Sequence, residues 1–171
     1  MSEASKAATI LDFLRFSEKL KCQKRDNTLS NGEKESVAAH SWQLAVMFML
    51  MQPHLEHQVD GLRVLKMLLV HDVVEAEVGD IPYSTALMHP ELKQKKREME
   101  RVEIIKIKEM LGDNGGEEIY ELWNEFEERQ SLEAKVAKAI DCMEANYQAI
   151  LFGDISYWDE IYHSLAFTKS D

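Results

Sequence analysis

Glycine, proline and cysteine are all scarce in this sequence. Only 7 Gly and 3 Pro occur among its 171 residues. That is too few for the many tight turns of an all-β sandwich, so a helical bundle is favoured. The two cysteines, Cys22 and Cys142, lie far apart and form no CxxC pair. They support neither a disulfide framework nor a thiolate zinc site, and we expect both to be buried, reduced thiols.

Long apolar runs and an excess of positive charge are missing as well. The longest apolar run, Leu44 to Met51, is far shorter than the roughly 20 residues of a membrane-spanning helix. The N-terminal residues contain neither a basic leader nor a long apolar stretch, so we expect a cytoplasmic protein without a membrane partner. The formal net charge of -11 opposes binding to long nucleic acids, because Lys and Arg must neutralise their phosphates. It does not oppose one small anionic substrate held by a metal ion and a single arginine.

Composition and the spacing of apolar residues predict one soluble, all-α domain. With 45% hydrophobic and 30% charged residues, the chain can bury one sizeable core. Periodicity predicts helices at residues 6–22, 36–53, 60–79, 90–111, 117–129 and 132–152, with a polar loop at 24–35. The expected domain covers residues 1–171, with a core at about 10–151 and an aromatic C-terminal tail packed on it as a last short helix. On the helix at 132–152 the expected inward stripe is Leu132, Val136, Ile140, Met143, Tyr147 and Ile150.

The stretch from Leu62 to Ser84 carries charge inside an apolar helical pattern. His71, Asp72 and Glu75 stand among apolar residues, where burial of charge is costly. Residues four apart share a helix face, so His71 and Glu75 should lie one above the other, with Asp72 beside them. A bound cation would explain the cost, because it turns a histidine and a carboxylate into ligands.

Two other helices that should be buried each carry one further candidate ligand, His40 and Asp141. Two imidazoles and two carboxylates suit one divalent metal ion, which could be Mn, Co, Fe, Ni, Zn or Mg. Four protein ligands would leave positions open for water and substrate. Such an ion lowers the pKa of a bound water and polarises a phosphoryl oxygen, which is the chemistry of hydrolysis.

The order of these ligands, His40, then His71-Asp72, then Asp141, resembles that of the HD-domain metal-dependent phosphohydrolases. Three blocks carry the likeness: ESVAAHSW at 35–42, HDVVEAEVGDIP at 71–82 and AIDCMEANYQA at 139–149. They are similar to the branch that contains bacterial 5'-deoxynucleotidases and the HD domain-containing protein 2 type. The resemblance implies an all-helical, HD-type bundle with a buried metal site, often assembled as a homodimer.

The resemblance also implies roles for individual residues. Those that match the family's metal ligands are His40, His71, Asp72 and Asp141. Those that match its acidic residues for activating water and contacting substrate, in the pattern HDxxExxxGD, are Glu75 and Asp80. Those that fall near the substrate phosphate are Arg25 and Ser36. Glu144 repeats a family position and either supports a ligand or pairs with a Lys or Arg.

Some positions differ from the pattern of the branch. Ala39 stands where an acidic residue usually precedes the first ligand, so one supporting carboxylate is missing. Asp26 and Asn27 follow Arg25 where glycine or tryptophan is usual, so no base preference is predicted. The basic run KQKKRE at 93–98 has acidic surroundings and is interpreted as a solvated helix face, not as a nucleic-acid patch.

The leading hypothesis is a metal-dependent phosphomonoesterase that hydrolyses (deoxy)nucleoside 5'-monophosphates to nucleoside and phosphate. One alternative is another HD-type phosphohydrolase, either a nucleotide triphosphohydrolase or a phosphatase of another small phosphate ester. Arg25 is the one well-placed basic side chain, which disfavours a long polyphosphate. A third hypothesis is a non-catalytic helical adaptor with a structural metal, and Glu75 disfavours it because a structural site is usually closed by its ligands.

Overall fold

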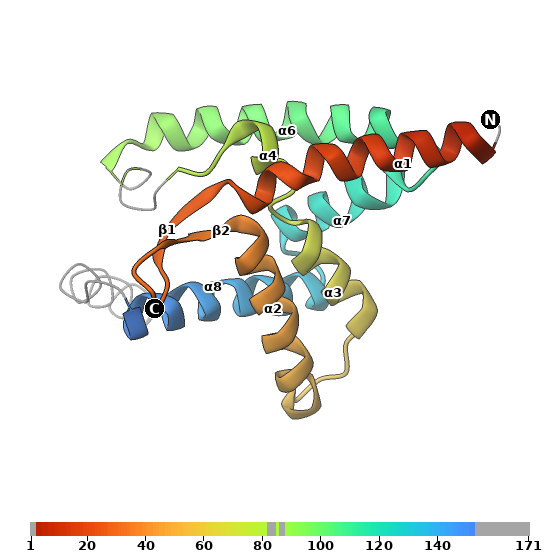
Figure 1. Cartoon of the computed structure of the whole chain (residues 1–171). Coiled ribbons are helices and arrows are strands. Elements are labelled where there is room, and N and C mark those ends of the chain that lie inside the picture. The colour runs from red at the N-terminus through yellow and green to blue at the C-terminus, as the bar shows by residue number, and fades with distance from the viewer. Residues whose placement is uncertain (1–2, 82–84, 86–87, 153–171) are drawn as a thin grey trace.

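The computed structural model describes residues 3–81, 85 and 88–152, and they fold mainly as helices (Figure 1). The helical elements are α1 (Glu3–Ser17), η1 (Glu18–Lys21), α2 (Val37–Met51), η2 (Gln52–His54), α3 (Gly61–Val70), α4 (Glu75–Val78), α6 (Pro90–Leu111), α7 (Gly116–Glu128) and α8 (Leu132–Phe152). The predicted all-α fold is confirmed. The C-terminal tail, expected to form a last short helix, lies outside the described residues.

The segment expected as a polar loop at 24–35 forms a β-hairpin instead. Strands β1 (Lys24–Thr28) and β2 (Lys34–Ser36) pair antiparallel, with Lys24 opposite Ser36. Two amide side chains fix the hairpin to its surroundings: Gln148 Nε2 on α8 donates to the Thr28 carbonyl oxygen at 2.8 Å, and Asn27 Nδ2 donates to the Ala145 carbonyl oxygen at 3.4 Å. Short polar strands lack the apolar alternation on which a strand prediction depends, so this element could not be found from the sequence.

Three helix starts are capped by side chains. Ser36 Oγ accepts the Ala39 N–H of α2, Asp60 Oδ1 accepts the Arg63 N–H of α3, and Ser131 Oγ accepts the Ala134 N–H of α8, each at 3.1 Å. A cap of this kind contributes about 1 kcal/mol to helix stability. The caps on α2 and α8 set where two of the site-bearing helices begin.

The helix predicted at 60–79 is broken in two, which corrects its assignment as one continuous helix. Between α3 and α4 the backbone hydrogen bonds change from the α-helical spacing of four residues to the 3-10 spacing of three. For example, the Glu75 N–H donates to the Asp72 carbonyl oxygen at 3.0 Å. In a turn of three residues, side chains at i and i+3 lie on the same side. Asp72 and Glu75 therefore share a side, instead of His71 and Glu75 as the four-residue spacing predicted. Gly79, with φ +79°, ends α4 in a conformation that favours glycine.

The main hydrophobic core lies between α2, α3, α7 and α8. In Figure 1, α1 and α6 run side by side along the top, and α2 and α3 descend from below them across α8. The largest buried side chains of this core include Leu44, Phe48, Met67 and Leu68. A second apolar cluster joins α6 and α7 to the turn before α4. The turn with His71 and Asp72 therefore lies between the two clusters, with Leu68 in one and Val73 in the other.

Two expectations about burial are wrong. Helix α8 turns small and polar residues inward, Ala134, Ala137, Asp141, Glu144 and Gln148, together with the predicted Ile140. Its predicted stripe residues Leu132, Met143, Tyr147 and Ile150 are exposed. A mean apolar periodicity cannot reveal a face that alternates alanine with site residues. Cys22 and Cys142 are free, as expected, but exposed instead of buried.

The described helices also bear on the membrane question. Across residues 3–81 and 88–152, no helix combines the length and the apolar composition that a bilayer span requires.

Candidate active site

The four residues predicted as metal ligands meet in space from three helical segments. His40 lies in α2, His71 and Asp72 follow α3, and Asp141 lies in α8. His40 Nε2 is 3.1 Å from Asp141 Oδ1, His71 Nε2 is 3.1 Å from Asp72 Oδ2, and His71 Nε2 is 3.9 Å from Asp141 Oδ1. Ligand atoms bound at about 2.0–2.2 Å around one metal ion stand about 3 Å apart. The ligand atoms of His40, His71 and Asp72 lie within 4.8 Å of one another, which fits one shared divalent ion, and Asp141 stands beside the two histidines.

The ring of His71 has one nitrogen available for a metal. Its Nδ1 lies 3.0 Å from the Leu68 carbonyl oxygen, which can only accept, so Nδ1 carries the proton. When the ring is neutral, Nε2 is then the nitrogen with the lone pair. It is buried and has no hydrogen-bond partner among the described residues. A buried nitrogen that faces two carboxylates and lacks a hydrogen bond is what a ligand position requires.

His40 is held by a carboxylate on each side of its ring. Nδ1 lies 2.5 Å from Glu144 Oε2, and Nε2 lies 3.1 Å from Asp141 Oδ1. Burial lowers the pKa of His40, but the hydrogen bonds to Asp141 and Glu144 outweigh it and raise the pKa to about 9. A metal at Nε2 would replace one proton and leave the Nδ1–H bonded to Glu144. Of the two roles left open for Glu144, support of a ligand is therefore the one that its contact favours.

The two carboxylates predicted as metal ligands remain ionised. Burial alone would raise the pKa of Asp72, but His71 and Arg25 outweigh it and hold the pKa well below its ordinary value. Burial also opposes ionisation of Asp141, and His40, His71 and Lys138 likewise hold its pKa well below the ordinary value. The site thus offers imidazole nitrogens and charged carboxylate oxygens, a donor set suited to borderline or moderately hard divalent ions.

Arg25 reaches this centre from the hairpin. Its Nη1 lies 3.2 Å from Asp72 Oδ2, and its Nε lies 3.4 Å from Glu35 Oε2. Glu35 is buried, and burial together with nearby Glu144 raises its pKa. Glu35 was not predicted as a site residue, because the hairpin that positions it was not predicted. Ser36 uses its hydroxyl to cap α2, so its contact with substrate stays a prediction.

Glu75 and Asp80 lie beside the metal ligands and share one basic partner, Lys96 of α6. Lys96 Nζ is 2.6 Å from Glu75 Oε1 and 3.3 Å from Asp80 Oδ1. Burial, then Asp72, raise the pKa of Glu75 to about 9, although Lys96 acts against them. The interpretation of 93–98 as a solvated face is therefore wrong for Lys96, because α6 turns this one lysine toward α4. Its spacing of four from Glu100 was the one available signal.

A second basic residue that the sequence did not reveal is Lys138. Its Nζ lies 2.5 Å from Asp141 Oδ2, one turn away on α8, and 5.4 Å from the centre of the Phe126 ring. Phe126 also packs on the ring of His71, with 4.8 Å between the ring centres. Lys138 and Phe126 together support both a carboxylate ligand and an imidazole ligand.

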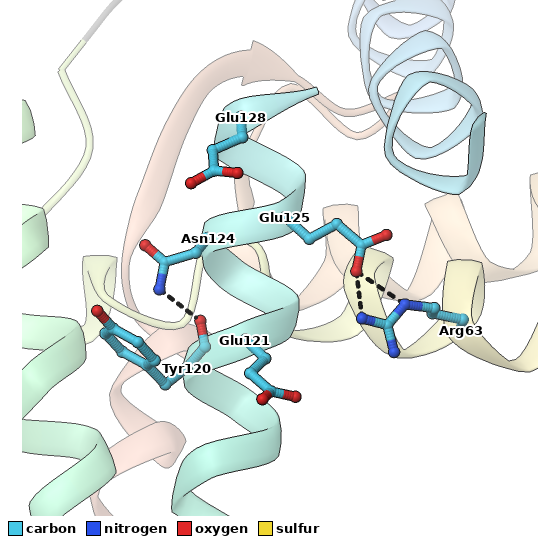
Figure 2. A pocket seen from close by; sticks show the side chains of 6 residues that line it. All are labelled: Arg63, Tyr120, Glu121, Asn124, Glu125 and Glu128. Atoms are coloured by element: carbon cyan, nitrogen blue, oxygen red, sulfur yellow. Dashed lines mark hydrogen bonds and ion pairs between the residues drawn. The ribbon is translucent and has the colours of Figure 1, made fainter. Parts of the chain in front are cut away.

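A pocket on the outer face of α7 lies apart from this centre. Figure 2 shows its lining residues, Arg63, Tyr120, Glu121, Asn124, Glu125 and Glu128. The guanidinium of Arg63 is paired with Glu125, which leaves the remaining glutamates to set the charge. An acidic pocket repels phosphate esters, and it contains none of the residues predicted for the site.

Comparisons with known proteins agree with the geometry. The HD domain family model matches residues 17–170. The Mus musculus protein named 5'-deoxynucleotidase HDDC2 is 33% identical over 157 residues, which cover 91% of this chain and 75% of that protein. Its Homo sapiens counterpart is 32% identical over 153 residues, covering 88% and 72%. A solved structure described as a predicted metal-dependent phosphohydrolase from Magnetospirillum magnetotacticum matches with a TM-score of 0.69 at 31% identity, covering 80% of this chain and 68% of that chain.

Proposed function

This chain belongs to the HD domain family, and from that premise we propose that it is a metal-dependent phosphomonoesterase. Its substrates would be (deoxy)nucleoside 5'-monophosphates, and its products nucleoside and inorganic phosphate. Relatives named 5'-deoxynucleotidase at 32–33% identity support this substrate class. The observation that carries the proposal is the buried His71 Nε2, which lacks a hydrogen-bond partner among the described residues and faces Asp72 and Asp141 beside a second pair of carboxylates.

We assign metal binding to His40, His71, Asp72 and Asp141. When bound there, a divalent ion would polarise a phosphoryl oxygen and lower the pKa of water. Glu144 holds His40 through Nδ1, and Leu68 holds His71 through its carbonyl oxygen. Both rings are thereby fixed with Nε2 toward the centre, so the ligands need little rearrangement when the ion binds.

The acid–base work falls to Glu75 and Asp80. A water oxygen attacks phosphorus, the bond from phosphorus to the 5'-oxygen breaks, and the departing alkoxide takes up a proton. Glu75 Oε1 is held by Lys96, while Oε2 is buried without a hydrogen-bond partner in the described part of the chain. In the carboxylate form of Glu75 that free oxygen is placed to accept the proton of the attacking water, and Asp80 to return a proton to the leaving oxygen.

Arg25 is the group best placed to bind the phosphate. Its guanidinium already lies against a ligand carboxylate, Asp72, so a phosphoryl oxygen at the metal site would come within its reach. A fixed guanidinium stabilises charge on phosphoryl oxygens and aligns them for attack. We expect positioning and electrostatic stabilisation to supply most of the rate gain.

The alternatives account for fewer of these contacts. A triphosphatase needs several free cations, yet Arg25, Lys96 and Lys138 are each paired with a carboxylate of the site. A structural metal in a helical adaptor would need its four ligands alone. It would give no reason to bury Glu75 next to them.

We further propose that the chain forms one domain over residues 1–171 and works as a homodimer in the cytoplasm. Apolar side chains are exposed on α1, at Ile10, Leu11 and Leu14, and on α6, at Val102 and Ile105. Since α1 packs along α6 (Figure 1), a second copy could cover both helices. Light scattering on the purified protein would reject this assembly if it gave the mass of one chain at all concentrations.

The enzymatic proposal is tested by activity measured metal by metal. Protein freed of metal by chelation would be supplied with Mn, Co, Mg, Fe, Ni or Zn and assayed for phosphate release from nucleoside mono-, di- and triphosphates. We expect monophosphates to be hydrolysed with at least one ion. The matched control is Asp72→Asn, which should release no phosphate. The proposal is wrong if no monophosphate is turned over with any ion.

A further inference from the structure

One lysine of the basic run on α6 turns inward while its neighbours face water. The side chain of Lys96 is 16% exposed, and its Nζ lies 2.6 Å from Glu75 Oε1, 3.3 Å from Asp80 Oδ1 and 3.5 Å from Glu100 Oε1. Lysine is rarely buried unless it is paired. Here one ammonium group joins carboxylates from α4, from the chain just after Gly79, and from α6 itself.

A purely structural role explains this arrangement poorly. Replacing a buried ion pair with apolar side chains is often neutral or stabilising, so such a pair is weak support for stability. Helix α6 is already held near α4 by the apolar cluster of Val73, Val74, Ile104 and Ile107. The packing of these helices therefore does not depend on a cation between them.

The two oxygens of Glu75 have different surroundings. Oε1 accepts a hydrogen bond from Lys96, whereas Oε2 is buried with no hydrogen-bond partner among the described residues. An unsatisfied buried carboxylate oxygen costs free energy and is expected only where another group binds to it. The lysine thus fixes one oxygen of the carboxylate and leaves the other directed elsewhere.

We propose that Lys96 is a positioning residue of the hydrolytic reaction, which binds Glu75 and Asp80 at once and holds their carboxylates side by side at the metal site. The inference rests on the proposed function, since it gives these carboxylates the attacking water and the leaving oxygen. In the described contacts Lys96 touches no predicted metal ligand, and on this assignment it does not touch the substrate. It acts through the orientation and the charge of its two partners.

The charges around Glu75 show what Lys96 contributes electrostatically. The acidic neighbours of Glu75 are Asp72, from the preceding turn, and Asp80, which follows α4. Helix α6 contributes the basic Lys96, which also pairs with Glu100. Arg25 of β1 lies on Asp72. On the other side of α4, Lys19 of η1 is paired with Glu77. Burial, Asp72 and Asp80 all raise the pKa of Glu75, and Lys96 lowers it. Without Lys96 the pKa of the Glu75 carboxyl would rise further, so the carboxylate form that accepts a proton from water would be reached only at higher pH.

The test compares Lys96→Met with Lys96→Arg and with Lys95→Met. Lys95 is the exposed neighbour on the same helix, so it controls for loss of one positive charge. We expect K96M to bind the same amount of metal as the unmodified protein. Its kcat at neutral pH should fall at least about tenfold. The acidic side of its profile of kcat against pH should move up by about one pH unit. K96R should restore most of the profile, and K95M should match the unmodified protein.

A second readout does not depend on turnover. It is the pKa of the Glu75 carboxyl, followed by carbon NMR in the metal-loaded protein. The variant Glu75→Gln identifies the signal of this carboxyl. The pKa should rise in K96M and not in K95M. If K96M does not fold, Lys96→Gln replaces it. If K96M stays active and neither its pH profile nor its Glu75 pKa changes, the role of Lys96 is overturned, while the proposed function still stands. A protein inactive on every monophosphate rejects the proposed function, and with it the reaction assigned to Lys96, even if the pKa moves.

Discussion

His40 and Glu144 form a fully buried pair, with 2.5 Å between His40 Nδ1 and Glu144 Oε2. The carboxylate comes from α8, one turn beyond Asp141, which faces the other nitrogen of the same ring. One helix therefore supplies both a proposed metal ligand and the group that orients a second proposed ligand. Because a hydrogen-bonded carboxylate raises the basicity of an imidazole and fixes its rotation, this pair should set the affinity for the metal.

The first prediction concerns Glu144. Replacing it with glutamine keeps the size of the side chain but removes the negative charge that faces His40 Nδ1. We expect Glu144→Gln to weaken metal binding by about 10–100-fold, as is usual when such a partner of a ligand is changed. The measurement is a competition titration of the metal-free protein against a chelating dye. Glu109→Gln, on the exposed side of α6, is the control and should bind metal normally.

The second prediction concerns pH. Because His40 has a pKa raised to about 9, its Nε2 carries a proton at neutral pH in the metal-free protein, and a metal must displace it. Apparent metal affinity should therefore increase about tenfold per pH unit from pH 7 toward 9 and level off above that. Asp72 and Asp141, with lowered pKa values, add nothing in this range.

Calorimetry in two buffers of different ionisation enthalpy would count the protons released. Close to one proton per metal ion is expected at pH 7.5. An affinity that stays constant from pH 7 to 9, with no proton released, would show that His40 is neutral before the metal arrives and that the pKa assigned to it is wrong.

The third prediction separates catalysis from metal binding. Glu75→Gln removes the proposed base while leaving all four ligands in place, so metal content should be unchanged while kcat falls by about 10²–10⁴-fold. Asp141→Asn should instead empty the site. Metal content by elemental analysis and kcat by phosphate release distinguish the two variants. Should the metal leave with Glu75, that residue is a ligand and the role assigned to it is mistaken.

The clustering of the four predicted ligands was accessible from the sequence because their order and their helical surroundings are local features. His40, His71, Asp72 and Asp141 each stand in a helical pattern, and the structure brings their side chains together. The break after Val70 was not accessible, since residues 62–79 are as compatible with one helix as with two. It is set by tertiary packing, and it changes which residue shares a side with Glu75.

Residues brought in by long-range contacts were missed for a similar reason. Lys96 belongs to a run whose composition is that of a solvated face, and only the packing of α6 on α4 turns it inward. Glu35 reaches the site through a hairpin of polar residues that no periodicity marks. Charge runs and short polar strands carry little information on burial, so the supporting residues of a site are harder to predict than its ligands.

The last prediction concerns the attachment of the hairpin to α8. Gln148 is buried and donates from Nε2 to the Thr28 carbonyl oxygen at 2.8 Å, and the same strand carries Arg25. Gln148→Met keeps the length of the side chain and removes the donor. We expect a loss of about 1 kcal/mol in the free energy of unfolding and a several-fold higher KM for the monophosphate, because Arg25 would be held less firmly. Metal affinity should not change, since Gln148 touches no ligand in the described contacts.

Gln130→Met is the matched control, because Gln130 is exposed and bonds only to the nearby Glu128 carbonyl oxygen among the described residues. If Gln148→Met lowers stability but leaves KM as it was, the hairpin does not depend on this bond to place Arg25, and the strand pairing with β2 must be sufficient.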